Sequence, residues 1–270
     1  MRVGFVGAGR MGRPMVSRLV ADGHDVHVLG RTAEKCRELE ELGVRVVNEA
    51  ADTGAHADAV VLCVFTDEQV RQVCLDGRLL PTMSSGSVLV VHTTASPHTI
   101  EAIAARAHHV DVVDAAVSGG PHDVAAGRLT LFVGGAEPAV DRVRPLLGCY
   151  ADPVLHVGPT GAGQKVKLVN NALFAGQIGL LAEAIRLGER LGVPESTLLS
   201  ALGHGSAASR VLNLVAAGGS VASFIEVAGD FVGKDVAVVR DIAAELGSGL
   251  GALDEVIKTF ESEPAVAKLV

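Results

Sequence analysis

Short apolar runs alternate with segments of helical spacing from Met1 to about Val157. Such alternation predicts βαβ units and a mainly parallel sheet, whose strands are continuously apolar because helices cover both faces. This part of the chain therefore predicts an α/β fold. The predicted strands are Val3 to Val6, Val26 to Leu29, Val44 to Val47, Ala59 to Val64, Ser87 to Val91, Val110 to Val113, Leu129 to Val133 and Val154 to Val157.

Strand signals stop beyond Gly161, and helical spacing takes over. A length of 270 residues allows two moderate domains. We place the boundary near Gly158, so that residues 1–158 form the α/β domain and residues 159–270 an all-α domain that begins with a long interdomain helix. The predicted helices span 162–191, 195–203, 208–217, 231–246 and 252–261.

Composition and charge exclude several classes of protein. Apolar residues make up 49% of the chain, which is enough for a buried core, and the net charge of -8 without a basic cluster argues against nucleic acid as a partner. Four cysteines lie far apart without metal-ligand spacing, so we expect no disulfide and no metal. The N-terminal residues lack the cationic start and long apolar run of a signal peptide, and the apolar stretch Leu168 to Ala182 is interrupted and short. We therefore expect a buried helix, no membrane and a cytoplasmic protein.

A glycine-rich segment, Gly7-Ala8-Gly9-Arg10-Met11-Gly12, follows the first predicted strand and precedes a helix. In a dinucleotide-binding loop the first glycine permits the tight turn, the second lets the pyrophosphate approach the backbone, and the third permits close helix packing. The alternative is a tight turn alone. The context between strand and helix favours a Rossmann-type dinucleotide-binding domain.

The second predicted strand ends at Leu29-Gly-Arg31-Thr32, where an NAD site usually has an acidic residue. A cation and a hydroxyl suit a 2′-phosphate, so the sequence favours NADP(H) over NAD(H). The alternative is that Thr32 only caps the helix starting at Ala33 and Arg31 is a solvated charge.

Small residues follow the strand Val110 to Val113 in the segment Asp114 to Pro121. Ser118, Gly119 and Gly120 can expose backbone N–H groups beside a hydroxyl, which predicts an anion-binding loop for a substrate carboxylate. A plain turn is the alternative.

Lys167 and Asn171 lie four residues apart in the predicted long helix, so both project from one helix face. Most helical lysines face water, which is the alternative for Lys167. The helix starts where the nucleotide domain ends and continues into an apolar stretch, so we expect that face to border a cleft. Lys165 points elsewhere and serves as an internal control.

Four motifs in this order resemble the β-hydroxyacid dehydrogenase family over almost the whole chain. They are Gly7 to Gly12, Asp114 to Gly120, Gly161 to Asn171, and Lys234-Asp235-Val236. The resemblance implies that Lys167 is the catalytic acid/base, that Asn171 helps to hold the substrate, and that Ser118, Gly119 and Gly120 bind its carboxylate. It also implies that Lys234 lies near the nicotinamide and that Val64, Phe65 and Thr94 line the dinucleotide; ordinary strand ends are the alternative for these three.

The sequence departs from the family pattern at Ala116, in the segments after the fourth and fifth strands, and in a short tail after Lys234. We therefore expect one wall of the substrate pocket or a dimer contact to differ from that of other members. A lysine with an ordinary pKa near 10.4 is a poor base at neutral pH, so either its surroundings lower that pKa or it acts as a charged hydrogen-bond donor.

The sequence predicts an NADP(H)-preferring oxidoreductase that interconverts a small β-hydroxy acid and its semialdehyde. An imine reductase and a non-catalytic NADP-binding sensor or scaffold are the alternatives. Because Leu168 to Ala182 is more apolar than one amphipathic face requires, we also expect a homodimer or homotetramer.

Overall fold

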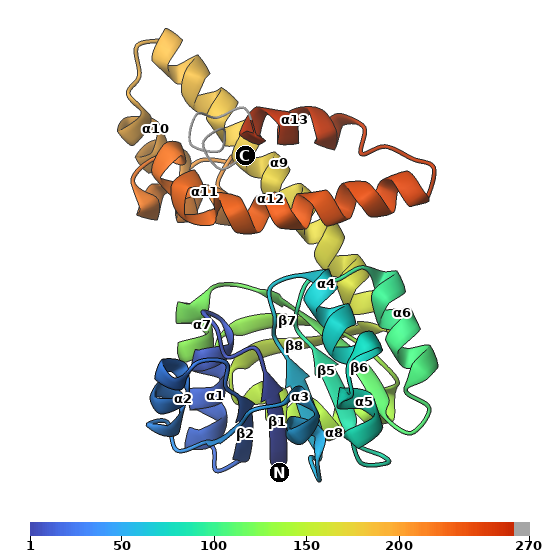
Figure 1. Ribbon diagram of the computed structural model, residues 1–270. Helices are drawn as coiled ribbons and strands as arrows, with labels where there is room; N and C mark the ends of the chain where they lie inside the picture. The colour runs from blue at the N-terminus through green and yellow to red at the C-terminus, as the bar shows by residue number, and fades with distance from the viewer. Residues whose placement is uncertain (262–270) are drawn as a thin grey trace. The chain divides into compact units, whose positions relative to one another are not determined.

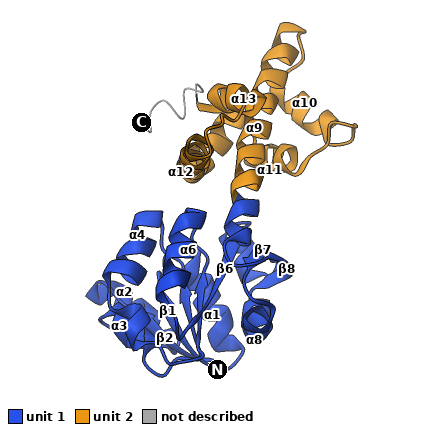
Figure 2. Cartoon of the chain, turned by 90° about the vertical axis from the view of Figure 1, so that its right-hand side faces the viewer, with its two compact units in different colours: residues 1–167 blue, residues 168–270 orange. Residues whose placement is uncertain are grey.

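The computed structural model describes residues 1–261, apart from the side chain of Asp230. The chain divides into two compact units, residues 1–167 and residues 168–270 (Figure 2). The division falls within a helix, between Lys167 and Leu168, whereas the sequence pattern places the domain boundary before that helix, near Gly158.

The first unit contains one sheet of eight strands in the order β3-β2-β1-β4-β5-β6-β7-β8 (Figure 1). All pairs are parallel except β6 and β7, which confirms a mainly parallel sheet. The first six strands have the order of a dinucleotide-binding fold, in which the reversal of strand order lies between β1 and β4. The strands are β1 (Arg2–Val6), β2 (Asp25–Leu29), β3 (Arg45–Val47), β4 (Ala59–Leu62), β5 (Val88–Val91), β6 (Asp111–Ser118), β7 (Leu129–Gly134) and β8 (Ala151–Gly158).

Helices cover both faces of this sheet, which is why β4 and β5 are buried along their whole length. One face packs against side chains of α1 (Gly12–Ala21), α2 (Ala33–Glu40), α7 (Pro121–Ala125) and α8 (Glu137–Gly148). The other packs against α3 (Ala50–Gly54), α4 (Asp67–Arg71), the π-helix η1 (Gln72–Asp76), α5 (Leu79–Thr82) and α6 (Pro97–Arg106). The sheet thus has two separate hydrophobic cores, as the apolar strands predict.

The second unit is entirely helical in its described residues, as the sequence predicts. Its core brings together Ile178, Val215, Ile225 and Phe260 from four helices. The helices are α9 (Ala162–Arg190), which begins in the first unit, α10 (Glu195–Leu202), α11 (Arg210–Gly218), α12 (Val221–Glu245) and α13 (Ala252–Glu261).

The start of α12 differs from the prediction, which placed this helix at 231–246. The helix begins at Val221, because the Ser220 side chain caps it by accepting the Ser223 amide at 3.0 Å. The expected loop after Gly219 is therefore a single N-cap residue.

The long helix α9 also exceeds its apolar stretch. The helix has 29 residues and a mean hydropathy of 1.3 in its most apolar window, so by length and composition alone it could cross a membrane, whereas the prediction concerned only the stretch Leu168 to Ala182. About 56% of that window is buried, and a core helix of a soluble protein passes the same test. The helix α11 and the segment Val221–Gly229 meet at a sharp bend. If they are counted together as one span, the described residues contain two candidate membrane-spanning segments.

Candidate active site

The glycine-rich segment forms the turn between β1 and α1, and its three glycines have different surroundings. Gly7 has φ 101°, and a Cβ there would lie 2.2 Å from the Cys63 carbonyl oxygen. A Cβ on Gly12 would lie 2.2 Å from the Gly7 carbonyl oxygen. A Cβ on Gly9, in contrast, would meet no atom within 4 Å. The protein itself requires glycine at positions 7 and 12, while position 9 keeps open space at the helix N-terminus, which fits the pyrophosphate of a dinucleotide.

These surroundings predict opposite effects for two alanine substitutions. Gly12→Ala should destabilise the protein by about 1–3 kcal/mol, because a Cβ overlaps a backbone oxygen. Gly9→Ala should leave stability unchanged within about 0.5 kcal/mol and weaken dinucleotide binding about tenfold or more. Thermal unfolding and cofactor titration of both variants measure this. Equal dinucleotide affinity of Gly9→Ala and the unmodified protein would contradict the assignment of the loop.

Arg31 and Thr32 follow β2, at the start of α2. The Thr32 side chain accepts the Lys35 amide at 3.3 Å, so its capping role is present. A groove of about 380 Å³ lies between the glycine-rich segment and α2. Its lining residues include three cations and are Ala8, Gly9, Arg10, Arg13, Pro14, Lys35, Glu38 and Leu39. The glycine-rich segment therefore adjoins a groove in which positive charge gathers.

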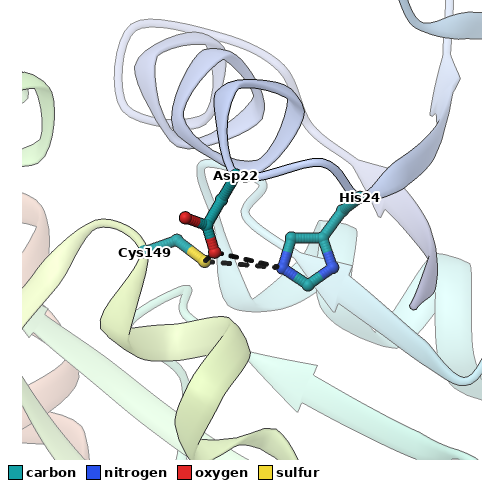
Figure 3. Close-up of side chains that lie close together, drawn as sticks. All are labelled: Asp22, His24 and Cys149. Carbon is teal, nitrogen blue, oxygen red and sulfur yellow. Dashed lines mark hydrogen bonds and ion pairs between the residues drawn. The ribbon is translucent and has the colours of Figure 1, made fainter.

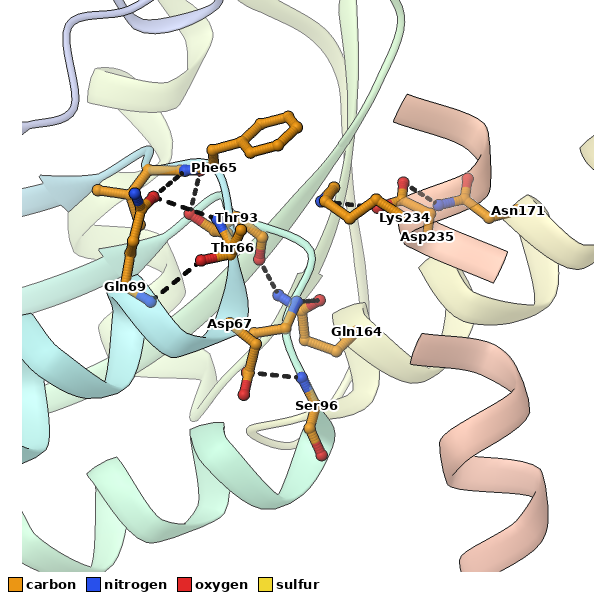
Figure 4. Close-up of polar contacts among 12 residues, drawn as sticks. Phe65, Thr66, Asp67, Gln69, Thr93, Ser96, Gln164, Asn171, Lys234 and Asp235 are labelled. Carbon is orange, nitrogen blue, oxygen red and sulfur yellow. Dashed lines mark hydrogen bonds and ion pairs between the residues drawn. The ribbon is translucent and has the colours of Figure 1, made fainter. Parts of the chain in front are cut away.

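The ends of β4 and β5 lie side by side and are joined by hydrogen bonds. The Thr93 hydroxyl donates to the Val64 carbonyl at 2.9 Å and joins the two segments, while within the segment after β4 the Phe65 amide donates to Gln69 at 2.8 Å (Figure 4). Phe65 is half-exposed and Thr94 is buried. The family resemblance implies that Val64, Phe65 and Thr94 line the dinucleotide. Val64 and Phe65 follow β4, which pairs with β1, and Thr94 follows β5, which pairs with β4.

Asp114 has a structural role that the sequence did not predict. Strand β6 continues to Ser118, because Asp114 to Ser118 pair with β7, so most of the expected anion-binding loop is a strand. The fully buried Asp114 carboxylate accepts the Gly161 amide at 2.5 Å and the Gln164 amide at 2.8 Å. Burial raises the pKa of Asp114, and these amide donors oppose that shift. Asp114 therefore holds the N-terminus of α9.

Gln164 is a second positioning residue that the sequence reasoning missed. It is fully buried, donates to the Thr93 carbonyl at 2.9 Å and accepts the Ala95 amide at 3.0 Å (Figure 4). Gly163 lets the same helix turn approach β7, because a Cβ there would lie 2.4 Å from the Phe132 carbonyl oxygen. The first turn of α9 and the segment after β5 are consequently held together.

Only part of the Ser118-Gly119-Gly120 segment remains a turn. Ser118 is the last residue of β6, and Gly119 has φ 131°. The Gly120 amide donates to Asp123 at 2.8 Å, so the carboxylate-binding role predicted for Gly120 competes with the capping of α7. Ser118 and Gly119 are the better candidates for a substrate carboxylate.

Lys167 and Asn171 both lie on α9, one turn apart, and both are buried, with 9% and 6% of their surfaces exposed. Lys165 is a contrasting case, because its side chain is 61% exposed and pairs with Glu101 at 3.4 Å. In the second unit Asn171 donates to Asp235 at 2.5 Å, and Lys234 pairs with the same carboxylate at 2.8 Å. The sequence motif predicted a role for Lys234 but none for Asp235. The Asp235 carboxylate bonds both Lys234 and Asn171.

His92 completes the polar groups buried behind the strand ends. Its Nδ1 lies 2.6 Å from the Ala115 carbonyl and its Nε2 lies 2.8 Å from the Tyr150 hydroxyl. Burial lowers the pKa of His92 to about 4, so the imidazole is neutral at physiological pH. It therefore donates to Ala115 and accepts from Tyr150, which is a structural role.

The fold and this edge of the sheet define an NAD(P)-binding oxidoreductase of two units. Residues 2–158 match the model of the NAD binding domain of 6-phosphogluconate dehydrogenase, and residues 161–266 match the NAD-binding domain of NADP-dependent 3-hydroxyisobutyrate dehydrogenase. The chain belongs to the β-hydroxyacid dehydrogenase family of NAD(P)-dependent oxidoreductases, which act on CH–OH groups.

Three similar proteins show the extent of the likeness. The chain is 30% identical to 2-(hydroxymethyl)glutarate dehydrogenase of Eubacterium barkeri over 86% of its own length and 76% of the other. It is 32% identical to human mitochondrial 3-hydroxyisobutyrate dehydrogenase, over 76% of its own length and 62% of that protein. The structure of Mycobacterium tuberculosis 3-hydroxyisobutyrate dehydrogenase with L-serine matches with a TM-score of 0.85 at 27% identity, covering 100% of this chain and 99% of the other.

Proposed function

We propose that this protein uses NADP(H) to interconvert a small β-hydroxy acid and its semialdehyde, with Lys167 as the general acid/base. The observation that carries the proposal is the burial of Lys167 on a helix whose first turn Asp114 and Gln164 hold in place. A lysine that only faced water would resemble Lys165. The substrate class is supported by the relatives, since 3-hydroxyisobutyrate, 2-(hydroxymethyl)glutarate and L-serine all carry a hydroxyl on the carbon β to a carboxylate.

The roles of the residues follow from their chemistry. The nicotinamide, when bound, supplies or accepts a hydride. Lys167 donates a proton from its Nζ to the carbonyl oxygen while the hydride adds to carbon, and it takes the proton back in the reverse direction. Ser118 and Gly119 bind the carboxylate, and Asn171 helps to hold the substrate while Asp235 fixes its amide group. Gly9 lets the pyrophosphate approach the backbone, Gly7 and Gly12 permit the turn and the helix packing that form the loop, and Lys234 serves the nicotinamide end.

Turnover assays test this proposal. Purified protein should oxidise NADPH in the presence of semialdehydes that carry a carboxylate, and a matched aldehyde without the carboxylate should react at least about tenfold more slowly. Cyclic imines belong in the same panel, because faster reduction of an imine would support the imine reductase alternative. Dinucleotide binding without turnover on any carbonyl compound or imine would support a sensor or scaffold instead.

The preference for NADP(H) rests on Arg31 and on the three cations of the groove beside the glycine-rich segment. An ion pair with the 2′-phosphate contributes about 1.5–3 kcal/mol, so Arg31→Ala should raise KM for NADPH by about 10- to 100-fold and leave KM for NADH within about twofold. Arg37→Ala, an exposed arginine on α2, is the matched control. An equal change in KM for both dinucleotides would overturn the role of Arg31.

We also propose a cytoplasmic homodimer or homotetramer that binds neither nucleic acid nor membranes. An apolar stripe on α9 supports self-association: Val169, Leu173, Leu180 and Leu187 share one face and are 50% to 70% exposed. A double Leu180→Glu, Leu187→Glu variant should be monomeric, whereas Leu246→Glu, at a more exposed leucine after α12, should not change the assembly. Light scattering at micromolar concentration tests both, and a monomeric unmodified protein would contradict the proposal.

A further inference from the structure

We propose that Asp22, His24 and Cys149 form a binding site for a transition-metal cation of the zinc class. The three side chains converge in the first unit, although Cys149 is 127 residues away from Asp22 in sequence (Figure 3). Cys149 Sγ lies 3.2 Å from Asp22 Oδ2 and 3.5 Å from His24 Nε2, and the latter two atoms are 3.8 Å apart. The sequence predicted no metal because the cysteines lie far apart, without CxxC or Cys/His metal-ligand spacing; the fold supplies the proximity.

Backbone hydrogen bonds hold all three residues in place. Asp22 ends α1, with its amide bonded to the Arg18 carbonyl at 3.0 Å, and His24 is bonded to the Leu19 carbonyl at 3.1 Å in the following turn. Cys149 ends α8, and its carbonyl accepts the Arg18 side chain at 2.7 Å. The three donor atoms therefore come from the ends of secondary-structure elements rather than from long loops.

The spacing of the three donor atoms matches one tetrahedral ion. Zinc binds cysteine sulfur at about 2.3 Å and histidine nitrogen or carboxylate oxygen at about 2.0–2.2 Å, which places tetrahedral ligand atoms about 3.4–3.6 Å apart. The observed separations of 3.2, 3.5 and 3.8 Å need shifts of only a few tenths of an ångström. Thiolate and imidazole ligands favour zinc over magnesium or calcium.

Charge also favours a divalent cation at this position. Cys149 is 7% exposed, and its thiol donates to the Asp22 carboxylate at 3.2 Å. When a divalent ion binds, the thiol proton passes to solvent, a sulfur–metal bond forms, and thiolate and carboxylate together balance the charge. The Asp22 side chain is 66% exposed, so solvent reaches the site and a water can complete the coordination.

The surroundings limit the affinity and the role of this site. His24 Nδ1 is buried and has no hydrogen-bond partner among the described residues, so we expect binding about 10- to 100-fold weaker than at a site whose histidine has such support. The ten residues of α1 separate Asp22 from the glycine-rich segment by about 15 Å. Occupancy should therefore stabilise the first unit without taking part in hydride transfer, and the inference is independent of the proposed function.

Cobalt titration tests the site. The full chain, freed of metal by chelation and dialysis and kept reduced with a phosphine, is titrated with Co²⁺ and then with Zn²⁺. We expect one equivalent of Co²⁺ to produce a thiolate-to-cobalt charge-transfer band that Zn²⁺ abolishes, with release of one proton per ion when the titration is followed in weak buffer. Zinc should also raise the midpoint of thermal unfolding.

Variants assign the signal to these residues. Cys149→Ser should abolish the band, and Asp22→Asn, at an exposed side chain, should weaken Zn²⁺ binding by about tenfold or more while the protein stays folded. Cys36→Ser removes another cysteine, and His98→Asn removes a histidine that lies 3.3 Å from Glu101 in an exposed pair; neither should change binding. Absence of the band in the unmodified protein, its persistence in Cys149→Ser, or equal zinc affinity in Asp22→Asn would overturn the proposal.

Discussion

Replacing Lys167 with alanine is expected to lower kcat/KM by about 10²- to 10⁴-fold, the usual contribution of a positioned general acid or base. The side chain is buried on α9, and its loss removes the proton donor that we propose for the carbonyl oxygen. Dinucleotide affinity should change by less than about threefold, because Lys167 is assigned to the substrate. Steady-state kinetics and cofactor titration separate the two effects.

Lys165→Ala is the matched control. It removes the same functional group two residues away on the same helix, but from a side chain that is 61% exposed and paired with Glu101. Exposed ion pairs contribute about 0–1 kcal/mol, so this variant should keep both activity and stability. If the Lys165 and Lys167 variants lost activity equally, or if neither lost any, the assignment of Lys167 would be wrong.

Replacing Asp114 with alanine should have the largest effect on stability. The substitution leaves the buried amides of Gly161 and Gln164 without an acceptor. Each unsatisfied buried donor costs about 1–3 kcal/mol, so the free energy of unfolding should fall by about 2–5 kcal/mol. Denaturant unfolding measures this. Asp111→Ala on the same strand is the control, since its side chain is 46% exposed and pairs with Arg142, and it should cost less than about 1 kcal/mol.

The ionisation of Asp114 adds a pH dependence with a definite sign. Burial raises its pKa in the folded protein above the ordinary value of 3.8, so the folded state binds the proton more tightly than the unfolded chain does. This difference in proton binding stabilises the folded protein fully below pH 3.8. The stabilisation is lost as the pH rises through the raised pKa of Asp114. The free energy of unfolding of the unmodified protein, measured relative to that of Asp114→Asn, should therefore decrease from acidic to neutral pH. A constant or growing advantage would contradict the direction of the shift.

Local patterns predicted the strands and the loops because parallel strands buried on both faces are apolar runs followed by small or polar residues. The glycine-rich segment could be interpreted in detail, since Gly7 and Gly12 are needed for close backbone packing within one turn. The extension of β6 was not predictable in this way. Asp114 and Ser118 lie in small-residue sequence typical of a turn, and only the antiparallel partner β7 makes that sequence a strand.

Long-range partnerships were the least predictable part of the site. The carboxylate of Asp114 serves amides 47 and 50 residues away, and Gln164 bonds the segment after β5, 71 residues away. No local spacing encodes such pairs. For the same reason the sequence does not reveal the cluster of Asp22, His24 and Cys149. Metal-binding motifs are recognised by short separations between ligands, whereas here the ends of two helices bring distant donors together.

The most direct test of the proposed hydride transfer uses NADPH that carries deuterium at both positions of the nicotinamide C4 carbon. With a carboxylate-bearing semialdehyde, the unmodified protein should place one deuterium on the carbinol carbon of the β-hydroxy acid, detectable by mass spectrometry, and Lys167→Ala should do so at least about a hundredfold more slowly. Product without deuterium, or equal transfer rates in the two proteins, would contradict the account.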